Sequence, residues 1–176
     1  MSRVPLADPH RLTGDERAQY DRFPSNLTRA LLLVDRRLAR ALPETANALR
    51  ASTLDPQLRE GVILRVAALQ GSVYERLQHL EQAYGTGWTQ EQTAAIEGGH
   101  HAALPGKYPA LMAFVDACVA SPSVDDATFD AVKVTLSPQE IATTLLLIGH
   151  YMSVARLTGV LQIEPDAQAD SWTAEH

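Results

Sequence analysis

Three side chains suited to acid–base chemistry lie close together near the middle of the chain. Ser72, Glu75 and His79 are three and then four positions apart, so a helix beginning at Ser72 places them on one face. A carboxylate and an imidazole on one face suit general acid–base catalysis, in which a side chain takes a proton from a substrate or returns it. A simpler interpretation remains open: Ser72 to Glu75 form a helix cap and His79 is a hydrogen-bonded core histidine.

Helix signals surround these residues. Asp55-Pro56 is an N-cap followed by proline at the first helical position, and Gly71 predicts a break before Ser72. Two stripes of apolar residues follow helical spacing, which indicates buried helix faces. The stripes are Val62, Val66, Leu69, Val73, Leu77 and Leu80, and Ile141, Leu145, Ile148, Met152 and Ala155.

The fold class predicted from these patterns is all-α. No segment alternates β-branched and polar residues between hairpin turns, so no sheet is expected. Capping boxes are predicted at residues 13–16, 72–75, 89–92 and 137–140. Helices are predicted over residues 13–23, 27–40, 43–52, 56–70, 72–84, 89–97, 107–120, 125–131 and 138–159. Short breaks between them indicate one domain over residues 13–163, with an N-terminal arm (1–12) and a C-terminal tail (164–176).

Composition excludes several classes of function. The net charge of −6 and the pI near 5.4 argue against nucleic-acid binding, which needs clustered Lys and Arg. No uncharged run approaches the ~20 apolar residues of a membrane span, and the N-terminus lacks the apolar core of a signal peptide. The single cysteine, Cys118, allows no intramolecular disulfide and no Cys-x-x-Cys redox pair. A cytoplasmic protein without a membrane or nucleic-acid partner is expected.

Residues 58–79 contain a Glu, a Ser-x-Tyr-Glu segment and a His at fixed distances. Glu60 lies twelve positions before Ser72, and His79 lies four positions after Glu75. This pattern resembles the carboxymuconolactone decarboxylase family, whose members carry either Cys-x-x-Cys or a version without cysteine at the Ser-x-Tyr-Glu position. Residues 148–157 also resemble the last helix of longer members, so the resemblance covers residues 25–165. It implies a single-domain, alkylhydroperoxidase D-like helical bundle.

The resemblance also implies a type of chemistry. In the branch with cysteines, a helix N-terminus lowers the pKa of a thiol, and a Glu and a His relay protons to it. Ser72 and Glu75 occupy the two sulfur positions here and cannot cycle electrons, which argues against peroxidase or peroxiredoxin-type activity. The resemblance then leaves Glu60 and His79 as the catalytic pair of a cofactor-independent acid–base enzyme.

Decarboxylation, isomerisation or a related proton transfer on a small organic acid, lactone or ring ketone is the reaction expected of that pair. The alternative is a non-catalytic family member that binds a small molecule or acts as an assembly subunit. An anionic substrate would need a cationic partner, for which Arg65 and Arg76 are candidates. Substrate binding is assigned to five side chains near the pair: Ser72, Tyr74, Glu75, His150 and Tyr151.

The last predictions concern metals, cofactors and the oligomeric state. His100 and His101 suggest a metal site, but adjacent histidines rarely bind one ion and no HExxH or carboxylate triad accompanies them, so no metal and no cofactor are predicted. Cys118 lies among apolar neighbours and is expected to be inert core. Family members assemble as rings, so the resemblance implies a homo-oligomer, a trimer or a hexamer, with a small-molecule substrate as the other partner.

Overall fold

The computed structural model describes residues 1–166, and within this range it consists of helices and connecting loops without a strand. The all-α prediction is therefore confirmed. The helices are α1 (Gly14–Arg22), α2 (Asn26–Leu31), α3 (Arg36–Arg50), α4 (Pro56–Gln70), α5 (Val73–Gly85), α6 (Gln90–Gly98), α7 (Tyr108–Ala120), α8 (Asp126–Lys133) and α9 (Pro138–Leu161), with 3₁₀ turns at Pro9–Arg11 and His101–Ala103.

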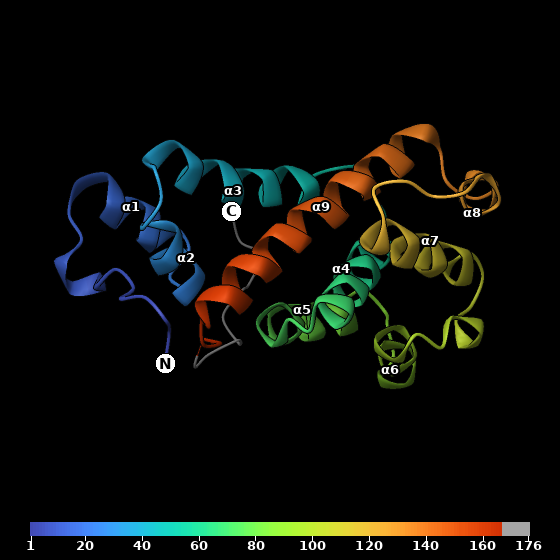
Figure 1. The fold of residues 1–176 in the computed structure, drawn as a ribbon, viewed down its shortest axis with the longest axis horizontal. Coiled ribbons are helices and arrows are strands. Elements are labelled where there is room, and N and C mark those ends of the chain that lie inside the picture. The colour runs from blue at the N-terminus through green and yellow to red at the C-terminus, as the bar shows by residue number, and fades with distance from the viewer. Residues whose placement is uncertain (167–176) are drawn as a thin grey trace.

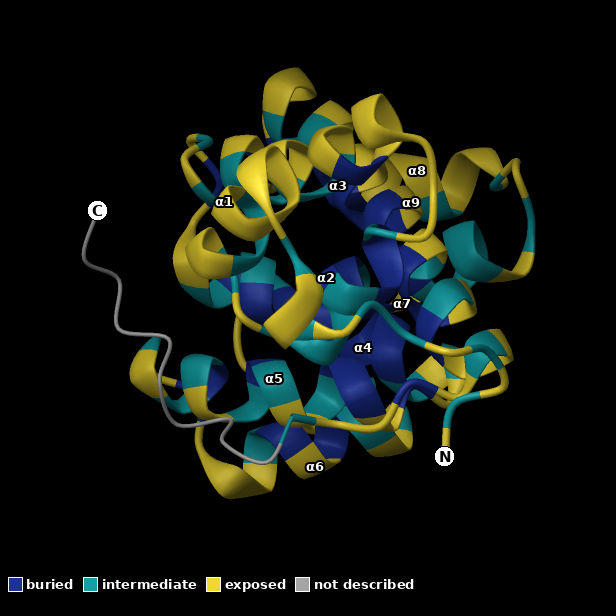
Figure 2. Cartoon of the chain, turned by 90° about the vertical axis from the view of Figure 1, so that its left-hand side faces the viewer, coloured by how far each residue is buried: buried dark blue, intermediate teal, exposed yellow. Residues whose placement is uncertain are grey.

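Helix α4 is the centre of the molecule. It packs most extensively against α5 and α9 and also contacts α6 and α7, while α9 runs diagonally across the bundle (Figure 1). A helix surrounded by other helices must be apolar on all sides, and α4 buries nearly every residue of its middle turns. Figure 2 shows this concentration of buried residues on α4 and α9, whereas α1 is mostly exposed. The core includes Leu58, Val62, Leu64 and Val66 from α4 and Leu147 from α9, each fully buried.

A glycine on α4 allows an indole ring to approach the helix backbone. A Cβ atom at Gly61 would lie 2.9 Å from Cζ2 of Trp88, which is closer than real Cβ contacts, and 3.2 Å from Cε of Met112, which is tighter than most. Trp88 is held in this position because its Nε1–H donates a hydrogen bond to the Gln57 carbonyl at 2.7 Å. The close approach of α4 to Trp88 therefore depends on the absence of a side chain at residue 61.

The predicted helices 27–40 and 43–52 are wrong in their division. The structure ends α2 at Leu31 and starts α3 at Arg36, so the break falls eight residues earlier than the sequence suggested. Asp35 begins α3, because its side chain accepts a hydrogen bond from the Arg37 amide at 2.9 Å. The N-cap at Asp35 decides the boundary, and α3 then continues without a break to Arg50.

Pro43 lies inside α3 and does not end it. Proline has no amide hydrogen, so the carbonyl of Ala39, one turn earlier, lacks its usual intrahelical partner. Gln19 of α1 supplies a substitute, since its Nε2 donates to the Ala39 carbonyl at 2.8 Å. Because a side chain satisfies this acceptor, the helix continues past the proline.

Helix caps agree with the sequence at three of the predicted boxes or caps and differ at two. Thr89 and Ser137 begin complete capping boxes, with Gln92 and Glu140 returning the second hydrogen bond, and Asp55 caps α4. The box predicted at residues 13–16 is wrong, because Thr13 makes no side-chain cap hydrogen bond. Residues 72–75 form half of a box, which matters for the site described below.

Both ends of the described chain lie near α2 and the end of α9. The Arg3 amide donates to the Leu161 carbonyl at 2.9 Å, and Asp166 accepts from the Asn26 amide at 2.6 Å. The division into an arm, a domain and a tail remains a prediction, and residues 167–176 of the predicted tail lie outside the described residues.

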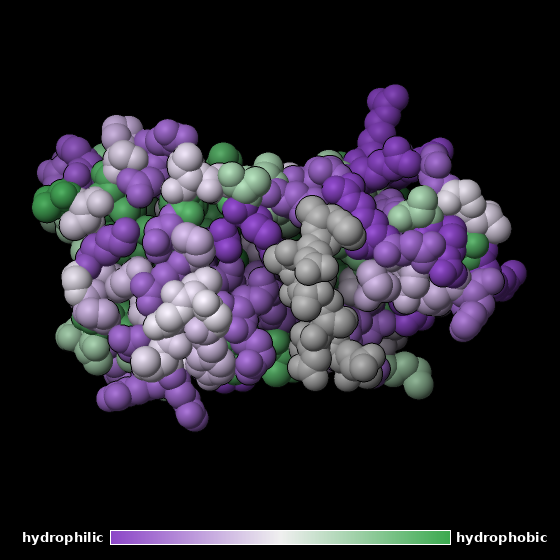
Figure 3. Space-filling view, turned by 180° about the vertical axis from the view of Figure 1, so that it is seen from behind, coloured by the Kyte–Doolittle hydropathy of each residue, from purple (hydrophilic) through white to green (hydrophobic). Residues whose placement is uncertain are grey.

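Helix α9 is long and apolar enough to cross a membrane by length and composition alone. It is also the helix that packs along α4, and core helices of water-soluble proteins meet the same criterion. Its position in the bundle therefore accounts for the buried part of its apolar surface. Figure 3 shows that the rear face of the molecule is largely hydrophilic.

We expect Gly61→Ala to destabilise the protein by about 1–3 kcal/mol, because the added methyl group overpacks the contact with Trp88. Gly149→Ala in α9 is the matched control, since no atom outside its own helix lies within 4 Å of the new methyl group. The control should gain about 0.5–1 kcal/mol from helix propensity. Urea unfolding of both variants measures the difference, and equal effects would contradict the packing explanation.

Candidate functional site

Glu60 and His79 meet in the core between α4 and α5. The Nδ1 atom of His79 lies 2.8 Å from Oε2 of Glu60, although the residues are 19 positions apart. Both side chains are buried, with exposed fractions of 1% for Glu60 and 6% for His79. The structure thus brings together the two residues that the sequence predicted as a catalytic pair.

Glu60 is a carboxylate with a partner on each oxygen. Its Oε2 is bonded by His79, and its Oε1 lies 3.1 Å from Nε of Arg59. Burial alone would raise the pKa of Glu60, but the hydrogen bond from His79 and the positive charges of His79 and Arg59 outweigh burial and hold it below its usual value. Glu60 is therefore ionised at neutral pH.

The Glu60 carboxylate fixes the orientation of the His79 ring. A carboxylate only accepts hydrogen bonds, so neutral His79 carries its hydrogen on Nδ1 and keeps a lone pair on Nε2. Tyr151 packs edge-on against the ring, with centroids 5.0 Å apart and planes at 87°. An imidazole held in one tautomer by a carboxylate is the arrangement used for general-base catalysis.

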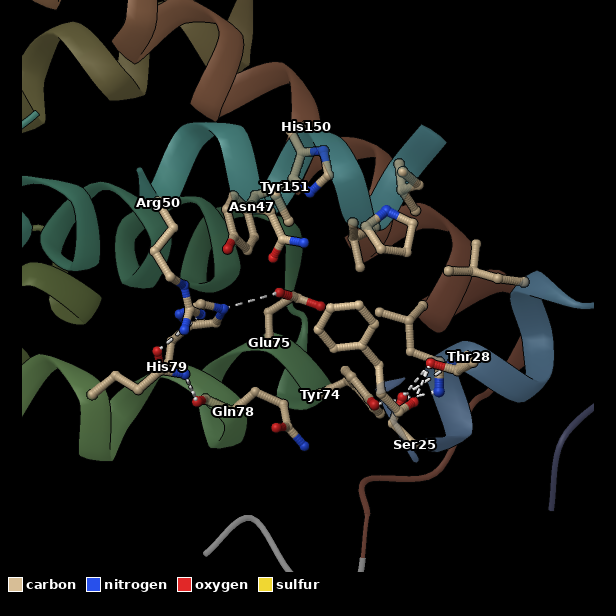
Figure 4. Close-up of a pocket in the computed structure, with 18 residues that line it drawn as sticks. Ser25, Thr28, Asn47, Arg50, Tyr74, Glu75, Gln78, His79, His150 and Tyr151 are labelled. Atoms are coloured by element: carbon tan, nitrogen blue, oxygen red, sulfur yellow. Dashed lines mark hydrogen bonds and ion pairs between the residues drawn. The ribbon is translucent and has the colours of Figure 1, made fainter. Parts of the chain in front are cut away.

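Glu75 is placed differently from what its capping-box position predicts. Ser72 caps α5, since its Oγ accepts a hydrogen bond from the Glu75 amide at 3.3 Å. The Glu75 carboxyl group does not return a bond to Ser72; it points toward His79, with Oε2 lying 3.7 Å from Nε2 (Figure 4). Burial raises the pKa of Glu75, and the positive charge of His79 opposes this shift only in part. The cap interpretation of Glu75 is therefore wrong, and its side chain belongs to the site.

A cavity of about 140 Å³ opens beside these groups. Helices α2, α3, α5 and α9 all contribute to its wall, as Figure 4 shows. One side is apolar and includes Phe23, Leu27, Leu31, Leu42 and Val154. The other end is polar and includes Asn47, Arg50, Gln78, Gln82, Glu75 and His79. Its volume is close to the ~150 Å³ of an engineered cavity that holds benzene, so it suits a ligand of about one small ring.

The predicted substrate-binding residues divide into two groups. Tyr74, Glu75, His150 and Tyr151 line the cavity, whereas Ser72 lies outside it as the cap of α5. The Tyr74 hydroxyl donates to Asp166 at 2.6 Å, so it is engaged at the edge of the site. Burial, together with the charge of His79, lowers the pKa of His150 to about 4, so His150 is neutral at physiological pH.

Neither of the predicted cationic residues reaches the cavity. Arg65 binds both oxygens of Asp116 at 2.6 and 2.8 Å, and Arg76 binds Glu97 at 2.6 Å. Arg50, the last residue of α3, lines the cavity instead. It was missed because no local pattern in the sequence indicates that this face of α3 borders the Glu60–His79 pair.

Cys118 and the adjacent histidines lie outside the site. Cys118 is a half-buried residue of α7 that packs against the core, and burial raises the pKa of its thiol. Nε2 of His101 lies 2.8 Å from Oδ2 of Asp116. Within residues 1–166, no group of three or more His, Cys, Asp or Glu side chains is arranged to hold a metal ion.

The comparisons with known proteins concern the family and the fold. The sequence model of the carboxymuconolactone decarboxylase family matches residues 36–120, a range that includes Glu60, Glu75 and His79. The resemblance predicted from the sequence is thus confirmed for this part of the chain, which runs from α3 to α7. A search of curated proteins gives no significant match.

Solved structures show the same fold. An uncharacterized peroxidase-related protein from Ralstonia eutropha JMP134 with an alkylhydroperoxidase AhpD core has a TM-score of 0.80 at 17% identity, covering 96% of this chain and 94% of that one. A peroxidase-related protein from Silicibacter sp. TM1040 has a TM-score of 0.77 at 16% identity, covering 96% and 93%. A cysteine-to-alanine variant of the debrominase Bmp8, in complex with 2,3,4-tribromopyrrole, has a TM-score of 0.73 at 15% identity, covering 96% of each chain. The alkylhydroperoxidase D-like fold is confirmed, and at these identities the likeness shows the fold alone.

The buried position of Glu75 predicts a pH-dependent effect on stability. Its folded-state pKa is raised, so the charged form weakens the folded state as pH rises from the ordinary carboxyl range through the folded pKa. Glu75→Gln removes that charge and should raise the Tm relative to wild type at pH 8, by an amount that shrinks as the pH falls toward 4. Thermal unfolding across this range measures the difference.

Glu140→Gln is the matched control, since Glu140 holds the same position in a complete capping box. The hydrogen bond from the Ser137 amide lowers the pKa of Glu140, so its carboxylate stabilises the folded state above the ordinary carboxyl pKa. This variant should therefore show no gain in Tm at pH 8. A Glu75→Gln profile that follows the Glu140→Gln profile would show that Glu75 acts as a cap.

Proposed function

We propose that this protein is a cofactor-independent acid–base enzyme that moves a proton on a small organic acid, lactone or ring ketone. The observation that carries the proposal is the buried Glu60–His79 pair beside a ring-sized cavity, with Glu75 close to Nε2 of His79. The match of residues 36–120 to the model of a family named for a decarboxylase supports a reaction of this type.

His79 is the proposed base. Its Nε2 takes a proton from a carbon next to a carbonyl group, and the Glu60 carboxylate stabilises the imidazolium that forms. Because Glu60 is already paired with Arg59, it orients the ring and need not accept the proton itself. The negative charge that develops on the substrate is an enolate.

Glu75 is the proposed acid. Burial favours its neutral form more than in an ordinary Glu, so it can donate a proton to the enolate. It lies 3.7 Å from Nε2 of His79, so removal and return of a proton occur on the same side of the substrate. Isomerisation uses both steps, and decarboxylation uses only the second, because CO₂ leaves in place of a proton.

Redox chemistry receives no support from the residues of this cavity. The similar structures include proteins named as peroxidase-related and a debrominase crystallised as a cysteine-to-alanine variant. In this chain Ser72 and Glu75 stand where the family resemblance places the two cysteines, and the single thiol, Cys118, does not line the cavity. The single cysteine also supports the cytoplasm as the proposed compartment.

A deuterium-exchange experiment tests the proposed chemistry. A thermal-shift screen of muconolactones, β-keto acids and polycyclic ketones selects ligands, and NMR in D₂O then follows deuterium entry next to their carbonyl groups or loss of CO₂. We expect His79→Ala to lower the rate by about 10²- to 10⁴-fold, the usual contribution of a general base.

The exposed residue His10 provides the matched control, since His10→Ala should exchange like wild type, as should Cys118→Ser. Exchange that continues unchanged in His79→Ala would reject the assignment of the base. Ligand binding without exchange in the wild type would favour the alternative, a non-catalytic binding protein.

A homo-oligomer, the trimer or hexamer implied by the resemblance, also remains a proposal. Its support is an apolar surface on α9, where Leu146 is 68% exposed and Leu145 is 44% exposed. We expect sedimentation velocity to show an oligomer for wild type and a smaller species for Leu146→Glu. A wild-type protein that sediments only as a monomer would refute the proposal.

A further inference from the structure

We propose that the cavity binds a ring-sized monocarboxylate and that Arg50 binds its carboxylate group. This inference deepens the proposed function, on which it rests for the identity of the site, by naming the class of ligand. It also assigns a residue that the sequence analysis did not consider, in place of Arg65 and Arg76.

Arg50 is positioned at the polar end of the cavity by contacts on both sides. One guanidinium nitrogen donates to Oε1 of Gln82 on α5 at 3.3 Å. Its carbonyl accepts a hydrogen bond at 3.1 Å from Arg59, which in turn holds Glu60. Figure 4 shows Arg50 reaching from α3 toward the part of α5 that carries His79. The guanidinium group is thus held against α5 by Gln82, and the backbone of Arg50 is linked to Glu60 through Arg59.

The charges around the cavity favour an anionic ligand. Among the residues of the described chain that line it, Arg50 is the one permanent cation and Glu75 is the one acid. Burial raises the pKa of Glu75, and His150 is neutral at physiological pH. The Glu60 carboxylate lies behind His79, outside the cavity lining. A guanidinium group offers a planar pair of N–H donors that matches a carboxylate, and Asn47 and Gln78 add amide groups nearby.

The opposite wall limits the ligand to one charge. Phe23, Leu27, Leu31 and Val154 form most of this wall. The two hydroxyl groups there, of Ser25 and Thr28, lie 3.1 Å apart and bond to each other, so a second charged group would lose its water without a charged partner. The volume of about 140 Å³ leaves room for about one small ring. A carboxylate at Arg50 with its apolar body against α2 and α3 meets both conditions, and it places the carbons next to the carboxylate near His79 and Glu75.

Isothermal titration calorimetry with benzoate and benzamide tests the proposal, because the two probes have the same shape and differ in charge. We expect wild type to bind benzoate at least tenfold more tightly than benzamide. Arg50→Gln should weaken benzoate binding by about tenfold to a hundredfold, the usual effect of losing hydrogen bonds to a charged group, and leave benzamide binding unchanged. Arg37→Gln, at an exposed position of the same helix, is the matched control and should bind like wild type.

Asn47→Asp keeps the native arginine and adds a negative charge to the cavity wall, so it should also weaken benzoate binding selectively. This variant and the comparison of the two probes on wild type decide the question even if Arg50→Gln does not fold. Equal affinity of wild type for benzoate and benzamide, or equal losses in Arg50→Gln and Arg37→Gln, would overturn the proposal.

The outcomes separate the two proposals. Selective binding of benzoate through Arg50, together with no deuterium exchange in any carbon acid, supports the ligand class and rejects the acid–base reaction. Exchange that depends on His79 but shows no preference for carboxylates supports the reaction and rejects the role of Arg50.

Discussion

A charged carboxylate inside a helical core is the constraint on which the site depends. Glu60 is buried, and a buried charge is costly unless partners reach both oxygens. Arg59 supplies one partner from the same helix, but the second must come from another helix, and His79 supplies it. Because His79 lies about two turns into α5, this bond fixes how α5 lies along α4. It also fixes which nitrogen of the imidazole is available for chemistry.

Two Ser-x-x-Glu segments show how far the sequence predicts the site. Ser72–Glu75 and Ser137–Glu140 have the same pattern, and the sequence predicts a capping box at each. Both serines cap their helices, because capping depends on nearby backbone groups. Glu140 is only partly buried and completes its box, whereas Glu75 is buried beside His79 and does not. Glu75 differs from Glu140 because residues of α3 and α9, which are distant in the sequence, surround the cavity into which its side chain points.

The fold shows the same contrast: helix bounds set by nearby residues were predicted correctly, and a bound that depends on another helix was not. The bounds of α4, α6, α7 and α9 follow from caps, glycines and apolar spacing and agree with the prediction to within two residues. The division of α2 and α3 was wrong because Pro43 ordinarily ends a helix, and the donor that lets α3 continue, Gln19, stands in another helix. The Glu60–His79 pair was expected only through the family resemblance, since no local pattern links residues 19 positions apart.

The bond from Gln19 to the Ala39 carbonyl also limits how the family segment can be separated from the chain. The family model begins at residue 36, so α1 lies outside it, as does α9, which supplies His150, Tyr151 and Val154 to the cavity. A fragment trimmed to residues 36–120 would contain Glu60 and His79 but neither the donor that supports the proline turn of α3 nor that wall of the cavity. The family segment therefore carries the Glu60–His79 pair, whereas the complete wall of the cavity requires the longer chain.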